Sequence, residues 1–277
     1  MARLKRWAFL GVVEYLGKLS VAVALVLWVW ERPDRETQSK LRAWQVLVEA
    51  EVSQTKASGG RIEALEFLSG KGVELSGVDL HEAYLPAVKL AGAVLNRATF
   101  KRAILSDAHF EGAYLKAANL DEAYLTGAKL NGAHLEHARL RGARFAGPHD
   151  DQTEYKREYQ RRDPGGFVVR MTYSYPADLT DAFLFGADLT DARLSGAMLR
   201  GADLRHARLD RASLGGTDLT GVGVGGASLN GTVIYGAQFH GAIGVTQEQI
   251  DAAKGDTSTT LPTGIVMPAN WRPPSEE

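Results

Sequence analysis

We expect an all-β solenoid from this sequence because three of its features indicate one repeating unit. First, every fifth residue from Leu75 to Phe145 is large and apolar, and the same spacing returns from Leu179 to Phe239. Second, the residue two places before each of these is small, and it is alanine in most units. Third, a period of five fits neither a helix nor an ordinary strand, whose periods of 3.6 and 2 would scatter these side chains over both faces.

The five-residue units are numerous enough to form a rod. Solenoid blocks are expected at 73–147 and 177–244. Block 1, at 73–147, holds fifteen units. Block 2, at 177–244, holds thirteen units within 177–241, so the 28 units make seven four-sided coils. In such a coil the large and the small residue of each unit point inward and the other three face solvent. Glycine at the last position of many units suits a tight corner. At about 4.8 Å per coil the rod would be roughly 34 Å long.

This small-x-large rule resembles the pentapeptide-repeat family, whose pattern is Ala-(Asp/Asn)-Leu-X-X. The resemblance implies a right-handed quadrilateral β-helix. It also places Asp178, Asp188, Asp203 and Asp218 in the family's usual Asp position, where a carboxylate accepts backbone hydrogen bonds at the corners. The Gly-Gly-Arg-Ile-Glu-Ala-Leu stretch at 59–65 and the chain's ending are similar to bacterial members that carry an N-terminal membrane helix.

Residues 1–32 are expected to hold a membrane anchor. Trp7 to Trp30 is apolar apart from small polar residues, Glu14 and Lys18, and its length as a helix, about 36 Å, is enough to span a bilayer. An interfacial helix and a cleaved signal peptide are the alternatives. The charges on the two sides are nearly balanced, so they decide the orientation only weakly. Four basic residues that follow the span favour a cytoplasmic solenoid: Arg32, Arg35, Lys40 and Arg42.

Helical segments are expected on both sides of the repeats. Residues 33–72 would form a stalk helix, with apolar residues at helical spacing, and then an N-terminal cap at Arg61–Leu68. Residues 245–277 would form a C-terminal cap helix and a tail, because Thr246-Gln247-Glu248-Gln249 has the capping-box pattern. Caps are needed because the open ends of a β-stack invite aggregation.

The repeats are interrupted at 148–176, and Ala177 resumes them in a clean register. The interruption predicts a helix, a turn and a strand, and a long excursion from so regular a fold is a candidate recognition element. The alternative is that its tyrosines pack against the solenoid wall. Its candidate partner-binding residues are Tyr155, Tyr159, Met171, Tyr173 and Tyr175.

Outward positions twenty residues apart should stack in columns. One column would contain Tyr84, Ile104 and Tyr124, and another Val94, Tyr114 and His134. Tyr84, Tyr124 and Tyr114 are therefore further candidate partner-binding residues. Alternatively, such ladders only stabilise the stacking of the coils.

Composition argues against several classes of protein. The chain has no cysteine, so thiolate metal sites and cysteine nucleophiles are excluded. No motif indicates a cofactor, a metal or an enzyme active site. The pair His134 and His137 is not expected to bind a metal, because one residue precedes an inward leucine and the other lies at a corner. A formal net charge of -1 argues against nucleic-acid binding.

The sequence therefore predicts a membrane-anchored, non-enzymatic scaffold that binds a protein partner whose identity the residues do not give. A homodimer is compatible with this prediction. The alternative is a DNA mimic that protects topoisomerase or gyrase, as quinolone-resistance members of the family do. That role needs a long anionic surface, whereas the repeats carry 14 basic and 15 acidic side chains.

Overall fold

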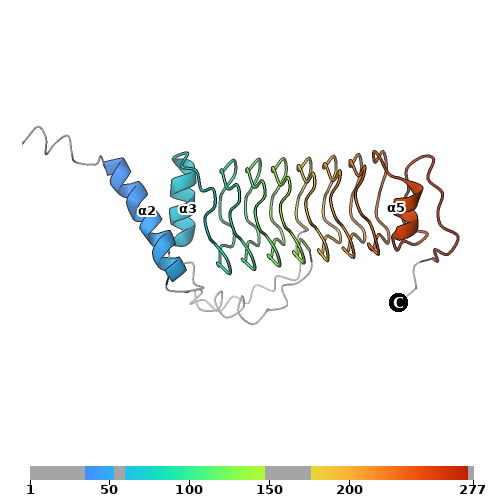
Figure 1. Cartoon of the computed structure of the whole chain (residues 1–277), viewed down its shortest axis with the longest axis horizontal. Coiled ribbons are helices and arrows are strands. Elements are labelled where there is room, and N and C mark those ends of the chain that lie inside the picture. The colour runs from blue at the N-terminus through green and yellow to red at the C-terminus, as the bar shows by residue number, and fades with distance from the viewer. Residues whose placement is uncertain (1–34, 53–59, 147–175, 274–277) are drawn as a thin grey trace, which may run out of the picture. The chain divides into compact units, whose positions relative to one another are not determined.

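The computed structural model describes residues 35–52, 60–146 and 176–273. The chain divides into two compact units, Met1–Gln45 and Val46–Glu277. Three helices are defined in the described residues: α2 at Arg35–Val52, α3 at Arg61–Gly70 and α5 at Gln247–Ala252. The repeats between α3 and α5 belong to the second unit and form a stack of coils (Figure 1).

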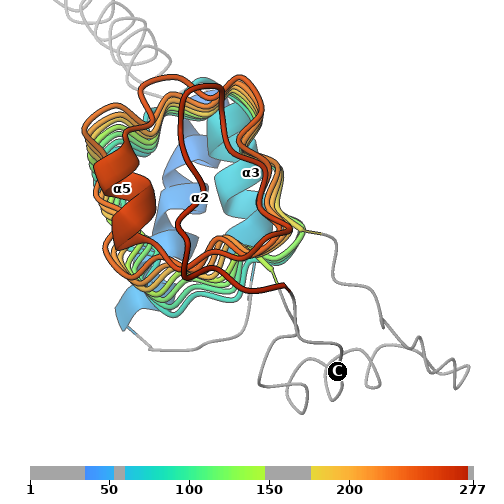
Figure 2. The same ribbon diagram turned by 90° about the vertical axis from the view of Figure 1, so that its right-hand side faces the viewer.

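The repeats form a four-sided β-helix (Figure 2). Each bridging residue pairs in parallel with the residue twenty positions later, as Asp79 does with Thr99. Backbone hydrogen bonds join the coils on both sides of such a bridge. For example, the amide of Leu80 donates to the carbonyl of Thr99 at 2.7 Å. Because five residues make one side, an offset of twenty gives four sides per coil, as the sequence predicts.

The interior of the coils is filled by the two inward residues of each unit. Leu85, Ala98 and Phe100 are fully buried, and the rings of Phe100 and Phe110 meet edge to face at 5.8 Å. Thr217 and Thr232 take the place of the usual alanine. The Thr217 hydroxyl donates to the Leu194 carbonyl at 2.9 Å, so this buried polar group is satisfied. The small residue is needed because four sides converge on one narrow space.

The coils continue in register across the interruption. Lys129 bridges to Asp178 and His134 to Phe183, an offset of 49 residues, which is twenty plus the 29 residues of 148–176. The amide of Ala177 donates to the carbonyl of Phe145 at 3.0 Å, so residues 145 and 177 lie side by side. The residues between 146 and 176, including the expected helix, turn and strand, lie outside the described part of the chain.

A helix covers the first coil. α3 starts after Gly60, whose φ of 85° is in the left-handed region, and it buries Leu65 and Leu68 completely. The Glu66 carboxylate accepts a hydrogen bond from the backbone amide of Lys89 at 2.9 Å. An amide at the end of the stack thereby gains a partner that no further coil supplies.

The last coil is covered by α5 and the tail. The predicted capping box is present, with the Thr246 hydroxyl accepting from the Gln249 amide and the Gln249 side chain accepting from the Thr246 amide. The Gln249 side-chain NH₂ also donates to the carbonyls of Val224 and Ala227, both at 2.9 Å. Trp271 is buried, and a side chain at Gly255 would collide with its ring.

The structure does not support a single-pass membrane protein, and this prediction is corrected. A span needs about 20 mainly apolar residues. Among the described residues, no helix is long and apolar enough to cross a membrane. α3 and α5 have 10 and 6 residues, and the 18 residues of α2 carry several charges, beginning with Arg35 and Glu36. The segment expected to be the anchor, within 1–32, lies outside the described residues.

Candidate functional site

The outward bridge residues form four columns, one on each side of the solenoid. We name each face by one member of its column. The Asp79 face carries Asp79, Thr99, Asn119, Arg139, Asp188, Arg208 and Ser228. The Tyr84 face carries Tyr84, Ile104, Tyr124, Arg144, Arg193, Ser213, Val233 and Lys254. The Lys89 face carries Lys89, His109, Lys129, Asp178, Met198, Asp218, Gln238 and Thr260. The Tyr114 face carries Val94, Tyr114, His134, Phe183, Asp203, Gly223 and Ile243.

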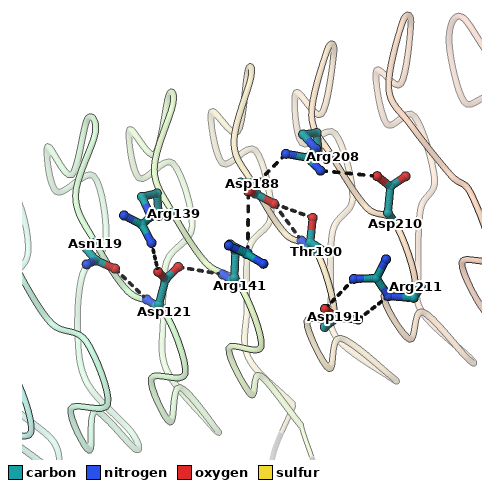
Figure 3. Close-up of polar contacts among 10 residues, drawn as sticks. All are labelled: Asn119, Asp121, Arg139, Arg141, Asp188, Thr190, Asp191, Arg208, Asp210 and Arg211. Atoms are coloured by element: carbon teal, nitrogen blue, oxygen red, sulfur yellow. Dashed lines mark hydrogen bonds and ion pairs between the residues drawn. The ribbon is translucent and has the colours of Figure 1, made fainter.

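Charges on the Asp79 face are paired along the axis (Figure 3). Asp188 lies between Arg141 and Arg208, with closest approaches of 3.9 and 3.6 Å. At the neighbouring corner, Arg211 donates two hydrogen bonds of 2.8 Å to Asp191, and this contact lowers the pKa of the Asp191 carboxyl. Acidic side chains that are neutralised in this way do not form the long anionic surface that a DNA mimic requires.

The Tyr84 face is partly covered. Tyr84, Ile104 and Tyr124 stack in one column, as the sequence predicts, but all three are only partly exposed. The Arg144 guanidinium lies 4.7 Å from the centre of the Tyr124 ring, within the range of a cation–π contact. Part of the Tyr124 ring is therefore in contact with the solenoid itself.

The Tyr114 face carries a stack of aromatic rings that is open to solvent. Tyr114 and His134 are 4.7 Å apart with planes within 3°, and His134 and Phe183 are 4.6 Å apart with planes within 4°. Tyr114 is 46% exposed and Phe183 is 42% exposed. The His134 ring nitrogen Nδ1 lies 3.2 Å from Glu136, which holds the middle ring in place. This is the largest aromatic column on the four faces among the described residues.

A second aromatic group lies along the corner beside this stack. The Phe185 ring meets His137 edge to face at 5.7 Å and His206 at 5.3 Å. Arg205 forms a bidentate pair with Asp203, with contacts of 2.8 and 2.7 Å, and the pair lowers the pKa of the Asp203 carboxyl. The aromatic surface thus reaches from one solenoid block into the other.

Sequence reasoning placed Tyr114 and His134 in one column but missed Phe183 and Phe185. The signal was available, because adding the 29 residues of the interruption to the usual offset of twenty connects His134 to Phe183. The other candidates, Tyr155, Tyr159, Met171, Tyr173 and Tyr175, lie outside the described residues.

The Lys89 face is mainly polar. It presents Lys89 and Lys129 to solvent, and His109 is paired with Glu111 at 3.0 Å. Met198 is its one large apolar side chain of high exposure among the described residues, at 41%. In the same described part of the chain, no three His, Asp or Glu side chains are grouped so that they could hold a metal ion.

The comparisons with known proteins agree with the repeat seen in the coils. Residues 74–112, 118–147 and 187–223 match the family model described as pentapeptide repeats, in eight copies. The resemblance to the pentapeptide-repeat family is thereby supported, and the observed four-sided coil is the quadrilateral β-helix that the family implies. No curated protein matches the chain.

Several solved structures are similar to this chain. QnrB1, a plasmid-mediated fluoroquinolone resistance protein, is 18% identical over 67% of this chain and 78% of its own, with a TM-score of 0.44. HetL, a pentapeptide repeat protein involved in heterocyst differentiation regulation from the cyanobacterium Nostoc sp. strain PCC 7120, is 28% identical. The alignment with HetL covers 71% of this chain and 77% of that chain, with a TM-score of 0.29. With TM-scores this low, no function is carried over from either protein.

Proposed function

We propose that this chain is a non-enzymatic scaffold that binds a protein partner through the outward faces of its solenoid. The observation that carries the proposal is the exposed stack of Tyr114, His134 and Phe183 on the Tyr114 face. Aromatic side chains are enriched at protein interfaces, where they bury a large apolar area and lose little conformational entropy. On this surface they are also already ordered by their contacts with one another.

The solenoid is suited to the role of a rigid mount. Its interior is filled by fully buried side chains, and each coil is hydrogen-bonded to its neighbours. A partner that docks on one face therefore meets side chains whose spacing is fixed by the coil, so less entropy is lost on binding.

An aromatic ladder also stabilises the coils that carry it, through contacts between neighbouring rings. That role explains the stacking distances on the Tyr114 face. It does not require Tyr114 and Phe183 to leave nearly half of their surface in water. Tyr84 and Tyr124, which are less exposed, fit the stabilising role better.

The segment 148–176 is a second, separate candidate for partner binding, and the proposal for the Tyr114 face does not depend on it. Its candidate residues, Tyr155, Tyr159, Met171, Tyr173 and Tyr175, follow from the sequence pattern alone. The chain leaves the solenoid after Phe145 and returns at Ala177, so the segment begins and ends at one corner, between the Tyr84 and Lys89 faces.

Photo-cross-linking from single positions tests the proposal. Benzoylphenylalanine at Phe183 would report contacts of the Tyr114 face, and the same residue at Met198 would report contacts of the Lys89 face. The two positions are matched in exposure, at 42% and 41%. In cells that naturally make the protein, we expect one protein to be cross-linked from position 183 and not from position 198. Equal cross-linking from both positions, or none from position 183, would contradict the proposal.

A further inference from the structure

We infer that the Tyr114 face and its adjoining corner bind an extended acidic peptide of about six residues that carries one aromatic or aliphatic side chain. This inference rests on the proposed function and names the chemistry of the partner. Three observations carry it: the orientation of the stacked rings, the unpaired cations beside them, and the length of the surface they make together.

The rings present their edges to a partner. Because the planes of Tyr114, His134 and Phe183 are parallel within 4°, their faces are turned toward one another and their edges face solvent. The edge of an aromatic ring carries the positive part of its quadrupole, so a column of edges attracts carboxylates as well as apolar groups.

Two cations beside the stack have no partner within the described part of the chain. Arg97 and Lys116 are exposed, and neither side chain has a hydrogen bond or an ion pair with another described residue. They lie on neighbouring coils, because the amide of Arg97 donates to the carbonyl of Lys116 at 2.9 Å. Lys116 is two residues after Tyr114, at the corner that adjoins the Tyr114 face.

Of the two acidic groups at this corner, Asp203 is paired with a cation, and Glu136 contacts His134, which is charged only when protonated. One oxygen of Glu136 lies 3.2 Å from His134, and Asp203 is held by Arg205 through two contacts. The corner also carries two exposed histidines, His137 and His206, either side of Phe185. Arg97 and Lys116 therefore outnumber the one carboxylate without a permanent cationic partner, Glu136, so the net charge of this corner is positive, which complements an acidic partner.

The surface has the length of a short peptide. The corner residues 97, 117, 137, 186 and 206 lie on five successive coils, which are separated by four steps along the axis. At about 4.8 Å per step this is roughly 19 Å, and an extended chain covers roughly 19 Å with about six residues. Such a peptide would lie along the axis, across the coils.

A single-stranded nucleic acid fits this surface less well. Proteins that bind it use free ring faces as platforms on which bases stack. Here the faces of the His134 ring are covered by Tyr114 and Phe183. We therefore favour the peptide and include an oligonucleotide as one arm of the test.

The test measures binding of the full-length chain to an array of fluorescein-labelled hexapeptides. Each probe has three Asp or Glu residues and one Phe, Tyr or Leu in varied order, and each has a counterpart with Asn and Gln in place of the acids. Fluorescence anisotropy gives the affinities. We expect the best acidic probes to bind at least tenfold more tightly than their amide counterparts, and more weakly as salt is raised.

Two matched double variants locate the site. Arg97→Glu with Lys116→Glu reverses the cations beside the stack, and Lys101→Glu with Lys129→Glu makes the same charge change on the other faces. All four side chains are exposed and lack an ion pair with another described residue. We expect the first pair to weaken acidic probes at least tenfold and the second less than twofold, with both variants folded by circular dichroism.

The inference is overturned if acidic and amide probes bind equally, if both double variants lose affinity equally, or if a labelled single-stranded hexanucleotide binds more tightly than every acidic probe. In each of these cases, a protein cross-linked specifically from position 183 would leave the proposed function standing. Absence of that cross-link would contradict both the proposed function and the inference about the peptide.

Discussion

At the corners of the solenoid, the last residue of each described unit has a positive φ. Its side chain also determines which residues fit at the same corner of the next coil. Among the described residues, twelve other than glycine adopt this conformation at the corners, for example Asp107 and His206. A side chain there lies over the same corner of the next coil. A Cβ at Gly226 would stand 2.7 Å from the His206 ring, and one at Gly127 would collide with Asp107. Glycine is therefore favoured at 127 and 226 for space as well as for φ.

Substitution of two glycines separates these requirements. Gly196 and Gly226 have φ of 72° and 70°, but a Cβ at Gly196 would meet nothing within 4 Å. We expect Gly196→Ala to lower the free energy of unfolding by about 1 kcal/mol, the cost of the left-handed conformation. Gly226→Ala should cost about 0.5–1 kcal/mol more, because the His206 ring must move. Denaturant unfolding measures both, and equal losses would mean that the His206 contact is unimportant.

Asp107 provides a pH-dependent prediction. Burial raises the pKa of its carboxyl, and the nearby His109 opposes this rise. Since the pKa is higher in the folded chain than in the unfolded chain, the ionised carboxylate destabilises the fold above the folded-state pKa. The effect is absent below the unfolded-state pKa. Because Asp107 is exposed, the effect is small, and we expect Asp107→Asn to raise the thermal unfolding midpoint only slightly at pH 7.

The same variant should lose its advantage at a pH of about 3, where the carboxyl of the unfolded chain is also protonated. Thermal melts of the two proteins from pH 7 to pH 3 follow this convergence. If the difference between the two unfolding midpoints stays constant from pH 7 to pH 3, the substitution acts through backbone preference alone and not through charge.

The helices could be predicted from the sequence because their signals are local. The Thr246-to-Gln249 motif predicts the start of α5, and α3 begins at Arg61 as expected but ends two residues later, at Gly70. The contacts of Gln249 with Val224 and Ala227 could not be predicted. They depend on where the last coil leaves its carbonyls without a partner, which only the folded stack determines.

Substitution of Gln249 therefore tests the C-terminal cap most directly. Gln249→Glu keeps the oxygen that accepts from Thr246 but removes the two donors to Val224 and Ala227. We expect a loss of about 2–3 kcal/mol, because a buried carboxylate would then face two carbonyls without a donor. Chemical denaturation measures the loss, and hydrogen exchange should speed up first in the last coil. Gln238→Glu, at an exposed position, is the control and should be nearly neutral.

At the scale of the whole molecule, the period of five predicts the coil because every inward position repeats. The twenty-residue offset also predicts the columns of Tyr84 and Tyr114. The same rule does not place Phe183 in the Tyr114 column, because the 29-residue interruption lengthens the offset from His134 to 49 residues. Partial coverage of Tyr124 by Arg144 could not be foreseen either, since it depends on the rotamer of a long side chain. The membrane prediction depended on the composition of residues 1–32, and no described helix supports it.

Removal of 148–176 tests the continuity of the rod. Joining Gly147 directly to Ala177 would put a glycine at the corner position and restore the five-residue register. We expect this deletion to change the free energy of unfolding by less than about 1 kcal/mol, since loop length contributes only weakly to stability. A deletion of 148–174 should cost little more, because its two extra residues lie at the same corner, where the intact chain keeps the register of block 2 across 29 extra residues. Circular dichroism and denaturant titration compare the two.

Our central proposal is that the Tyr114 face binds a protein partner and that the solenoid holds this face rigid. Photo-cross-linking from position 183, in chains with and without 148–176, tests it most directly. We expect the same cross-linked protein in comparable yield from both chains. Loss of the product on deletion of 148–176 would contradict it and assign recognition to that segment, and absence of any product from position 183 would remove the claim.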